Sequence, residues 1–437
     1  MGKWVEKKLG EYVKGIRGVS YKPFDLMDTK TPNAFYLLRS NNIQESKLDL
    51  SDMQIVDKKC VKESQALNKG DIVVCMSNGS KRLVGKSCLF NLEENGFCVG
   101  AFCSHFSPNG SGDGDFVFQL FQSDGYQRFI DVSLAGSAIN NLKNSTIEEF
   151  EFLVPESKEE QATIAAILTT IDQAIKKTAQ LVAKYERIKT GLMQDLLTRG
   201  IDEEGNIRSE ETHEFKDSAL GRIPKEWEWY SLSELFQMKS GSTPHRKAFK
   251  KYFQNGNINW AKTLDLNEGY ILTTDEKITQ AAIKETSCYI LPEDTILIAM
   301  YGGWEQIGRT AILKVSSSTN QAITALIEPK KEISPEFTQF SLQSLRHRWK
   351  KFAVSTRKDP NITKTDIGNF IIPFPSFSEQ KLIVKQIQEV NKKLVNEKYL
   401  LEKYKFTKTG LMQDLLTGKV CVDALINQMN ESIYPIQ

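Results

Sequence analysis

The chain has 437 residues, more than one ordinary domain of roughly 100–200 residues, and its 57 basic and 55 acidic side chains leave a formal net charge of only +2. It is therefore not a bulk polycation, and any charged surface must come from uneven placement. No stretch approaches the roughly 18 consecutive apolar residues of a membrane span, and the N-terminus is too charged for a signal peptide. The seven cysteines show no paired CxxC spacing, which is typical of a reducing compartment. These features predict a soluble, cytoplasmic chain.

The first predicted domain covers residues 1–156. Its apolar run Asp71–Met76 is bounded by Gly and Asn and predicts a buried strand followed by a polar loop. Cys98, Cys103 and His105 lie near one another in the sequence. Zinc spacings are usually tighter and no fourth ligand is evident, so we predict no metal site.

A long helix is predicted for residues 157–199. Ser157 is a suitable N-cap, acidic residues follow in the first turn, and no proline interrupts the segment. Apolar residues step by four and three, as expected for one face of a helix. The positions predicted to form the helix seam are Ile164, Leu168, Ile171, Ile175 and Leu192.

An internal repeat organises the whole chain. The ten residues Lys189–Thr198 recur letter for letter as Lys408–Thr417, and Glu160-Gln161 matches Glu379-Gln380 at the same offset. A fixed long period is the mark of a duplicated unit. The residues between such anchors share almost nothing, which suggests two modules with one architecture and two different ligands.

The second half follows the same plan: a linker over residues 200–222, a domain over 223–375, a helix over 376–418 and a tail over 419–437. Thr295–Met300 predicts a buried strand, and Gly302-Gly303 a loop after it. The predicted seam of the second helix contains Ile383, Ile387, Val390, Leu394 and Leu411. Because the register of the two helices is identical, an antiparallel coiled coil within the chain is the economical arrangement. Each helix would span about 60 Å.

Charge is concentrated in acid-free runs. One run, between Leu235 and Leu264, mixes basic residues with amides, hydroxyls and aromatic side chains, and a second follows Arg346. Lys and Arg suit phosphates, while Asn, Gln, Ser and Arg can hydrogen-bond base edges. An ordinary solvated surface is the alternative. The residues predicted to contact DNA are Ser77, Asn78, Lys81, Arg82, Lys86, His245, Arg246, Lys247, Lys250, Lys251, Trp304, Gln306, Arg309, Arg357 and Lys358.

Motifs for catalysis are missing from the sequence. There is no GxxxxGK[ST] loop, no strand-linked GxGxxG and no Asn-Pro-Pro-aromatic tetrapeptide, and the four histidines show no ligand spacing. The sequence therefore predicts a chain that is not itself a catalyst.

Several motifs together resemble the DNA-specificity subunit of Type I restriction-modification systems. They are Leu220–Trp227 opening the second domain, Ser240–Pro244, Tyr301–Gly303, Ile372–Pro375, and the two Gly-Leu-Met-Gln-Asp-Leu-Leu helix ends. The first domain departs from this pattern, because it starts directly at Trp4 and its Met76–Lys81 loop has no double glycine. The resemblance covers essentially the whole chain.

This resemblance implies an α+β protein with two mixed α/β target-recognition domains in tandem, each followed by a long helix. Each domain would bind one half of a bipartite site in double-stranded DNA, and the paired helices would fix the spacer between the halves. The helices would also dock two methyltransferase subunits. The resemblance leaves room for a restriction subunit, and S-adenosylmethionine, ATP and Mg²⁺ would belong to these partners.

Two other readings are open. A coiled-coil scaffold with protein-binding end domains explains the helices but leaves the basic polar loops unmotivated. A fused nuclease or methyltransferase would need the motifs that the sequence lacks.

Overall fold

The computed structural model describes residues 3–135, 140–353, 361–420 and 422. The chain divides into two compact units. Unit 1 contains residues 1–179 and 398–437, and unit 2 contains residues 180–397. The two longest helices, α4 (Lys158–Thr198) and α10 (Phe377–Leu415), each contribute one part to each unit.

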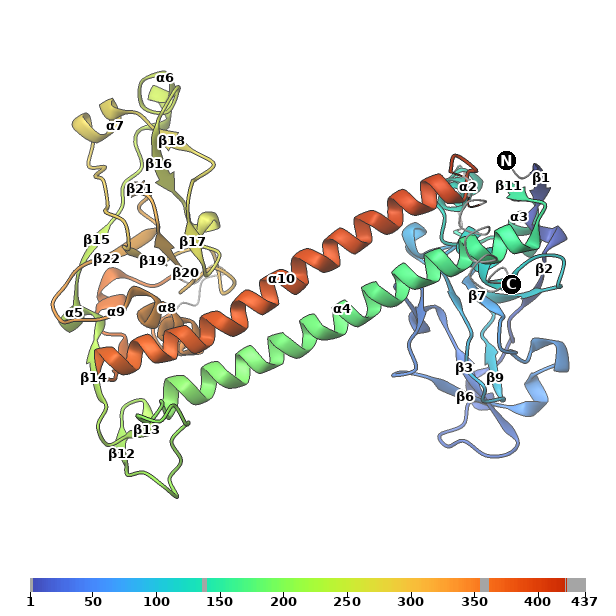
Figure 1. Cartoon of the computed structure of the whole chain (residues 1–437), viewed down its shortest axis with the longest axis horizontal. Helices are drawn as coiled ribbons and strands as arrows, with labels where there is room; N and C mark the ends of the chain where they lie inside the picture. Colours follow the sequence, from blue (N-terminus) through green and yellow to red (C-terminus); the bar gives the residue numbers. More distant parts are fainter. Residues whose placement is uncertain (1–2, 136–139, 354–360, 421, 423–437) are drawn as a thin grey trace, which may run out of the picture. The chain divides into compact units, whose positions relative to one another are not determined.

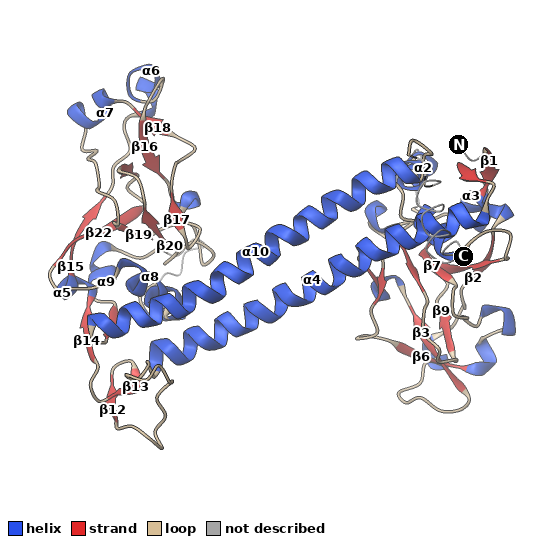
Figure 2. Ribbon diagram, viewed as in Figure 1, coloured by secondary structure: helices blue, strands red, loops and turns tan. Residues whose placement is uncertain are grey.

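Unit 1 is built on small sheets beside the helix pair (Figure 2). The largest has the order β2-β10-β7-β8, and a second sheet, β6-β3-β9, pairs β3 with β9 in parallel. A further pair joins the first strand of the unit to the strand that precedes α4. The bounds are β1 Trp4–Lys8, β2 Val13–Arg17, β3 Ala34–Leu38, β4 Ile43–Gln44, β5 Lys47–Leu48, β6 Gln54–Asp57, β7 Ile72–Cys75, β8 Ser87–Leu89, β9 Phe97–Val99, β10 Cys103–Pro108, β11 Glu151–Pro155, α1 Gly114–Leu120, α2 Asp124–Ser133 and α3 Asn144–Glu148.

Unit 2 repeats this plan. Its sheet β15-β22-β19-β20-β17 corresponds to β2-β10-β7-β8 with one added strand, and β18-β16-β21 corresponds to β6-β3-β9, again with one parallel pair. The bounds are β12 Phe215–Ser218, β13 Gly221–Pro224, β14 Glu228–Ser231, β15 Phe236–Ser240, β16 Ile258–Ala261, β17 Tyr270–Ile271, β18 Lys277–Ile278, β19 Ile296–Ala299, β20 Thr310–Leu313, β21 Ser317–Thr319, β22 Ile323–Pro329, β23 Ile371–Phe374, α5 Leu232–Leu235, α6 Phe249–Tyr252, α7 Gln280–Glu285, α8 Pro335–Ser344 and α9 Lys364–Gly368.

The predicted strands and helix starts are confirmed. All residues of β7 and β19 are buried, as the apolar runs indicated. At the start of α4 the backbone N–H of Glu160 donates to Ser157 Oγ over 3.3 Å, and Glu379 N donates to Ser376 Oγ over 3.3 Å at the start of α10. The two serines satisfy N–H groups that the helix leaves open.

Within each unit, the helix segments lie side by side and antiparallel (Figure 1, α4 in green and α10 in red). The core of unit 1 joins Ile164 and Leu168 of α4 to Leu411 and Leu415 of α10. The core of unit 2 joins the matching residues of the repeat, Ile383 and Ile387 of α10 with Leu192 and Leu196 of α4. The predicted fold class and the pairing of the helices are confirmed.

One polar contact of the helix pair occurs in both units. In unit 1, Lys408 Nζ donates to Asp172 Oδ1 over 2.6 Å, and in unit 2, Lys189 Nζ donates to Asn391 Oδ1 over 2.8 Å. The two lysines are the first residues of the identical ten-residue segments. Each unit therefore pairs its helices in the same register.

A buried glutamine joins each helix start to the rest of its unit. Gln161 Oε1 accepts from Asp113 N over 3.0 Å, and its Nε2 donates to Pro155 O over 2.8 Å. In unit 2 the repeat equivalent Gln380 accepts from Ser334 N over 2.9 Å and donates to Pro375 O over 3.0 Å. Asp113 and Ser334 are the N-caps of α1 and α8. The second residue of the Glu-Gln pair thus ties a helix cap, a strand end and a long helix together.

Candidate nucleic-acid interface

Four loop segments meet at corresponding places in the two units. In unit 1, Val19 N donates to Val99 O over 2.7 Å, Gly100 N to Leu38 O over 2.9 Å, and Met76 N to Phe102 O over 2.8 Å. These bonds join the loops after β2, β3, β7 and β9.

Unit 2 makes the same backbone bonds. Ser242 N donates to Thr319 O over 2.9 Å, Asn320 N to Ala261 O over 3.0 Å, and Met300 N to Ala322 O over 2.8 Å. The loops after β15, β16, β19 and β21 therefore form the corresponding face, on which the Ser240–Pro244 and Tyr301–Gly303 motifs both lie.

A glycine in each unit permits this close approach. A Cβ on Gly18 would stand 2.2 Å from Gly100 O, and one on Gly241 would stand 2.2 Å from Asn320 O. No side chain fits at either position without moving the backbone. This accounts for the glycine in the Ser240–Pro244 motif.

Each face holds a basic side chain oriented by a carboxylate. Arg39 follows β3 directly, and its Nη2 lies 2.9 Å from Asp52 Oδ2. Lys262 follows β16 directly, and its Nζ lies 2.7 Å from Glu276 Oε1. Each of these basic residues is followed by one 3-10 turn. In unit 1 the Arg39 backbone N–H donates to the Asn42 side chain, and in unit 2 the Lys262 backbone N–H donates to the Asp265 side chain. Both units therefore have the same arrangement of a basic side chain, a carboxylate partner and a 3-10 turn.

The predicted basic run of unit 2 is partly neutralised by acids from later in the chain. Arg246 Nη1 lies 2.6 Å from Glu276 Oε2, and the Arg246 guanidinium lies over the rings of Phe253 and Trp260 at 4.4 and 5.1 Å. The hydrogen bond from Arg246 is the largest cause that lowers the pKa of Glu276, with Lys262 adding to it. The ion pair and the two ring contacts together orient the Arg246 side chain.

The remaining residues of this run differ in their availability. Lys251 pairs with Glu285. His245, Lys247 and Lys250 are exposed, and no carboxylate within the described ranges forms an ion pair with either of these two lysines. Lys247 and Lys250 are thus exposed lysines of the run whose ammonium groups have no carboxylate partner among the described residues.

The loop after β19 requires its double glycine. Gly302 and Gly303 have φ of +113° and +73°, in the region that favours glycine, and a Cβ on Gly302 would stand 2.6 Å from Gln306 Cβ. Trp304 is 49 % exposed beyond this turn. Gln306 and Arg309 are half-buried.

The second basic run supports this loop. Arg346 donates to Ile307 O over 3.1 Å and to Glu305 O over 2.7 Å. Trp304, Arg346, His347 and Lys350 line a hollow of about 220 Å³. Arg357 and Lys358 lie outside the described residues.

In unit 1 the predicted residues divide into two groups. Lys81 and Arg82 are exposed on a short 3-10 turn. Ser77 and Asn78 are half-buried, and Asn78 Nδ2 donates to Ser40 Oγ over 3.3 Å. Lys86 Nζ donates to Ile43 O over 2.7 Å, so this ammonium already supports the fold.

Sequence reasoning missed Arg39, Asp52 and Glu276 at this interface. The signal that would have found them is the repeat itself. Leu38–Asn42 reads Leu-Arg-Ser-Asn-Asn, and Ala261–Asp265 reads Ala-Lys-Thr-Leu-Asp. Both segments have a basic residue, then a hydroxyl residue, and a turn-closing residue at the fifth position. An alignment scored on identical residues alone does not detect this similarity.

A buried network stands at the end of the first helix in unit 2. Glu379 accepts from Arg208 Nη1 over 2.5 Å, from Ile201 N over 2.9 Å and from Trp227 Nε1 over 3.1 Å. All of these side chains are almost completely buried. In unit 2 the network gives the glutamate of the Glu-Gln pair its partners, one of which is the tryptophan at the end of the Leu220–Trp227 segment.

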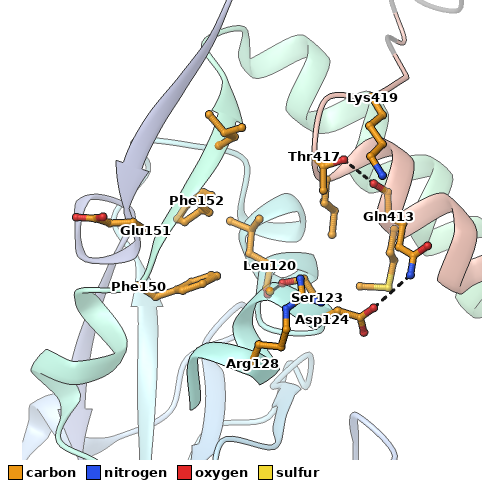
Figure 3. A pocket seen from close by; sticks show the side chains of 14 residues that line it. Leu120, Ser123, Asp124, Arg128, Phe150, Glu151, Phe152, Gln413, Thr417 and Lys419 are labelled. Carbon is orange, nitrogen blue, oxygen red and sulfur yellow. Dashed lines mark hydrogen bonds between the residues drawn. The ribbon is translucent and has the colours of Figure 1, made fainter. Parts of the chain in front are cut away.

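Unit 1 has a groove beside the end of α10 (Figure 3). The groove, of about 640 Å³, lies between α2, β11 and the end of α10, with Arg128, Phe152 and Gln413 among its lining residues. In unit 2, Leu220 and Ile223 belong to the same hydrophobic cluster as Leu197, whose repeat equivalent Leu416 lines the groove of unit 1. The end of the linker and the residue after it thus cover this leucine in unit 2, whereas Leu416 faces a groove among the described residues of unit 1.

The cysteines and histidines offer no metal site among the described residues, in which no group of three or more His, Cys, Asp or Glu side chains is arranged to hold an ion. Burial raises the pKa of the Cys88 and Cys98 thiols to about 12 and lowers the pKa of His105. None of the helices in the described ranges is long and apolar enough to cross a membrane.

The family model for the Type I restriction modification DNA specificity domain matches residues 1–185 and 224–403. The chain belongs to this family. The DNA specificity domain is therefore present twice, and the resemblance predicted from the motifs is confirmed.

Two specificity subunits of known restriction enzymes match along most of their length. The StySPI specificity subunit of Salmonella potsdam is 26% identical over 395 residues, which cover 89% of this chain and 82% of the relative. The EcoKI specificity subunit of Escherichia coli K12 is 25% identical over 400 residues, with the same coverage. The crystal structure of the S subunit of a Type I restriction-modification system from M. genitalium matches with a TM-score of 0.61 at 18% identity, covering 95% of this chain and 96% of that one. At that identity the structural match shows the fold alone.

Proposed function

We propose that this chain is the specificity subunit of a Type I restriction-modification complex, and that each unit reads one half of a bipartite site in double-stranded DNA. The observation that supports this is the duplicated loop face. Each unit presents an oriented basic residue, Arg39 or Lys262, on a common backbone frame, while the neighbouring side chains differ. Basic residues position a protein on phosphates, and differing neighbours allow different bases to be read.

The helix pair supports a second part of the proposal, the docking of two methyltransferase subunits. Gly191 and Gly410 occupy the same place in the two identical segments, and a Cβ on either would meet no atom within 4 Å. Glycine costs a helix about 1 kcal/mol relative to alanine, so packing within the chain does not explain these residues. Close approach of a partner backbone does, and two identical segments suit two copies of one partner.

Catalysis would belong to the partners. We propose that S-adenosylmethionine is used by the methyltransferase subunits, and ATP and Mg²⁺ by a restriction subunit where one joins. The paired helices would then act as the spacer between half-sites. A coiled-coil scaffold that binds only proteins would not need two matched faces carrying oriented basic residues.

A domain exchange tests this function. Residues 227–370 would be replaced by the matching segment of a relative of known site, the chain would be combined with its methyltransferase subunits, and methylated adenines would be mapped across a genome. We expect one half of the methylated sequence to change and the other half to stay. Methylation that changes in both halves, or that has no defined sequence even with the unmodified chain, would contradict the proposal.

A further inference from the structure

A cleft of about 630 Å³ opens on the loop face of unit 1. It lies where the loops after β2, β3 and β9 meet, and Tyr21, Arg39, Asn41 and Phe102 are among its lining residues. The predicted loop of Lys81 and Arg82 does not line it. The cleft is joined to that loop by the hydrogen bond from Asn78 to Ser40.

Phe102 is an exposed aromatic side chain on a rigid turn. Its side chain is 69 % exposed, although its main-chain carbonyl accepts from both Met76 N and Ser77 N, over 2.8 and 3.1 Å. The preceding carbonyl, that of Ala101, accepts from Arg17 Nε over 2.8 Å. Single exposed apolar side chains are common on protein surfaces, but this ring lines the same cleft as the polar side chains of Arg39 and Asn41.

Arg39 and Asn41 are held in place by one carboxylate. Asp52 Oδ2 accepts from Arg39 Nη2 over 2.9 Å and from Asn41 Nδ2 over 2.9 Å. Asn41 is exposed, and its amide keeps one N–H and the Oδ1 oxygen for a ligand, since one Nδ2–H suffices for Asp52. Asparagine uses this donor and acceptor pair to recognise adenine in the major groove.

Unit 2 has the same backbone here with different chemistry. The position of Asn41 is taken by Leu264, which is 70 % exposed, and the position of Phe102 by Ala322. The basic position is filled in both units, by Arg39 and Lys262. Two modules that read different half-sites need this combination of a common phosphate contact and divergent base contacts.

We propose that the unit 1 cleft binds the DNA of the first half-site, with Asn41 and Phe102 as its specificity-determining residues and Arg39 as a backbone contact. This inference rests on the DNA recognition proposed above. Asn41 pairs with an adenine edge, and the Phe102 ring contacts the C5-methyl group of a thymine. The half-site read by unit 1 therefore contains A·T pairs at these positions.

The test uses Asn41→Ala and Phe102→Ala in the full chain, combined with its methyltransferase subunits. Methylated sites would be sequenced, and the half-site that stays constant in the exchange of residues 227–370 is the one assigned to unit 1. We expect each variant to relax one A·T position of that half-site, and in Asn41→Ala, which removes a bidentate contact, discrimination should fall about 5- to 150-fold. The other half-site and the spacer should not change. Asn91→Ala and Val132→Ala, two exposed positions of unit 1 outside the cleft, serve as matched controls.

Asn41→Asp is a second variant that keeps the side-chain size. It removes the amide donor and should lower the preference for adenine. The melting temperature should fall slightly, because the new carboxylate lies beside that of Asp52, and recovery of the complex checks that the chain still folds. Unchanged site preference in Asn41→Ala, Asn41→Asp and Phe102→Ala would overturn the cleft assignment and leave the specificity function standing. If the unmodified complex itself methylates no defined sequence, the proposed function fails instead.

Discussion

The two units share their internal contacts and differ in their outer ones. Gln161 and Gln380 make the same pair of hydrogen bonds, and the same lysine joins the helices in each. By contrast, Trp227 Nε1 is bonded to Glu379, whereas Trp4 Nε1 has no partner among the described residues. The Leu220 and Ile223 side chains have no described counterpart over the groove of Figure 3. The comparison teaches that the helix junction is the shared frame, whereas the bond from the tryptophan and the packing of Leu220 and Ile223 are described for unit 2 alone.

The largest effect is expected from breaking the Glu379 network. Glu379→Ala leaves the buried Arg208 guanidinium without its carboxylate, and removing one partner of a buried pair costs about 3–5 kcal/mol. The free energy of unfolding should be measured by urea denaturation. Lys225→Ala, which removes an exposed ion pair with Glu214, is the control and should change the free energy of unfolding little. Equal losses for the two variants would show that the network does not stabilise unit 2.

The next effect compares the two glutamines directly. Gln161→Ala and Gln380→Ala each leave a backbone N–H and a prolyl carbonyl unpaired, at about 1–3 kcal/mol for each group that stays buried. Because the contacts match, the two losses in unfolding free energy should be similar. If only one variant lost unfolding free energy, the two glutamines would share their geometry but not their contribution to stability.

The glycines of the repeated segment test the docking surface with a small effect on the chain itself. Gly191→Gln and Gly410→Gln should each stabilise the isolated chain by up to about 1 kcal/mol, because glutamine is a better helix former. Each should also remove one methyltransferase copy, and the double variant both, as measured by the mass of the purified complex. Thr190→Gln, exposed on the same helix, is the control. Full binding by the double variant would place the partner elsewhere.

The smallest effects concern single phosphate contacts in unit 2. Lys247→Ala and Lys250→Ala should each reduce the slope of log affinity against log salt by about one unit. Lys251→Ala should reduce it less, because Glu285 already pairs with that lysine. Binding isotherms at several salt concentrations give the slopes. If Lys251→Ala has the largest change, its ion pair opens when DNA binds.

Local patterns predicted the elements well, and tertiary contacts account for what they missed. The heptad-like spacing predicted both long helices, Ser157 and Ser376 their starts, and the apolar runs β7 and β19. The acid-free run after Leu235 predicted a basic surface, but Glu276 and Glu285 reach it in the folded unit from later in the chain. Lys86 was predicted to contact DNA because its charge is visible in the sequence, whereas its bond to the Ile43 carbonyl is not. The charge of a segment can be read from the sequence, but the partners that neutralise it can be identified only from the folded structure.

The division of the chain between the units has a consequence for synthesis on the ribosome. Unit 2 is one continuous segment, but the core of unit 1 includes Leu411, Leu415 and Leu416, close to the end of the chain. The core of unit 1 therefore cannot be completed until about 220 further residues, the whole of unit 2, have been synthesised. At about 5–20 residues per second, this synthesis takes roughly 10–45 s. The domain that is made first completes its fold last, and during that interval its apolar helix face is exposed to chaperones or to another nascent chain.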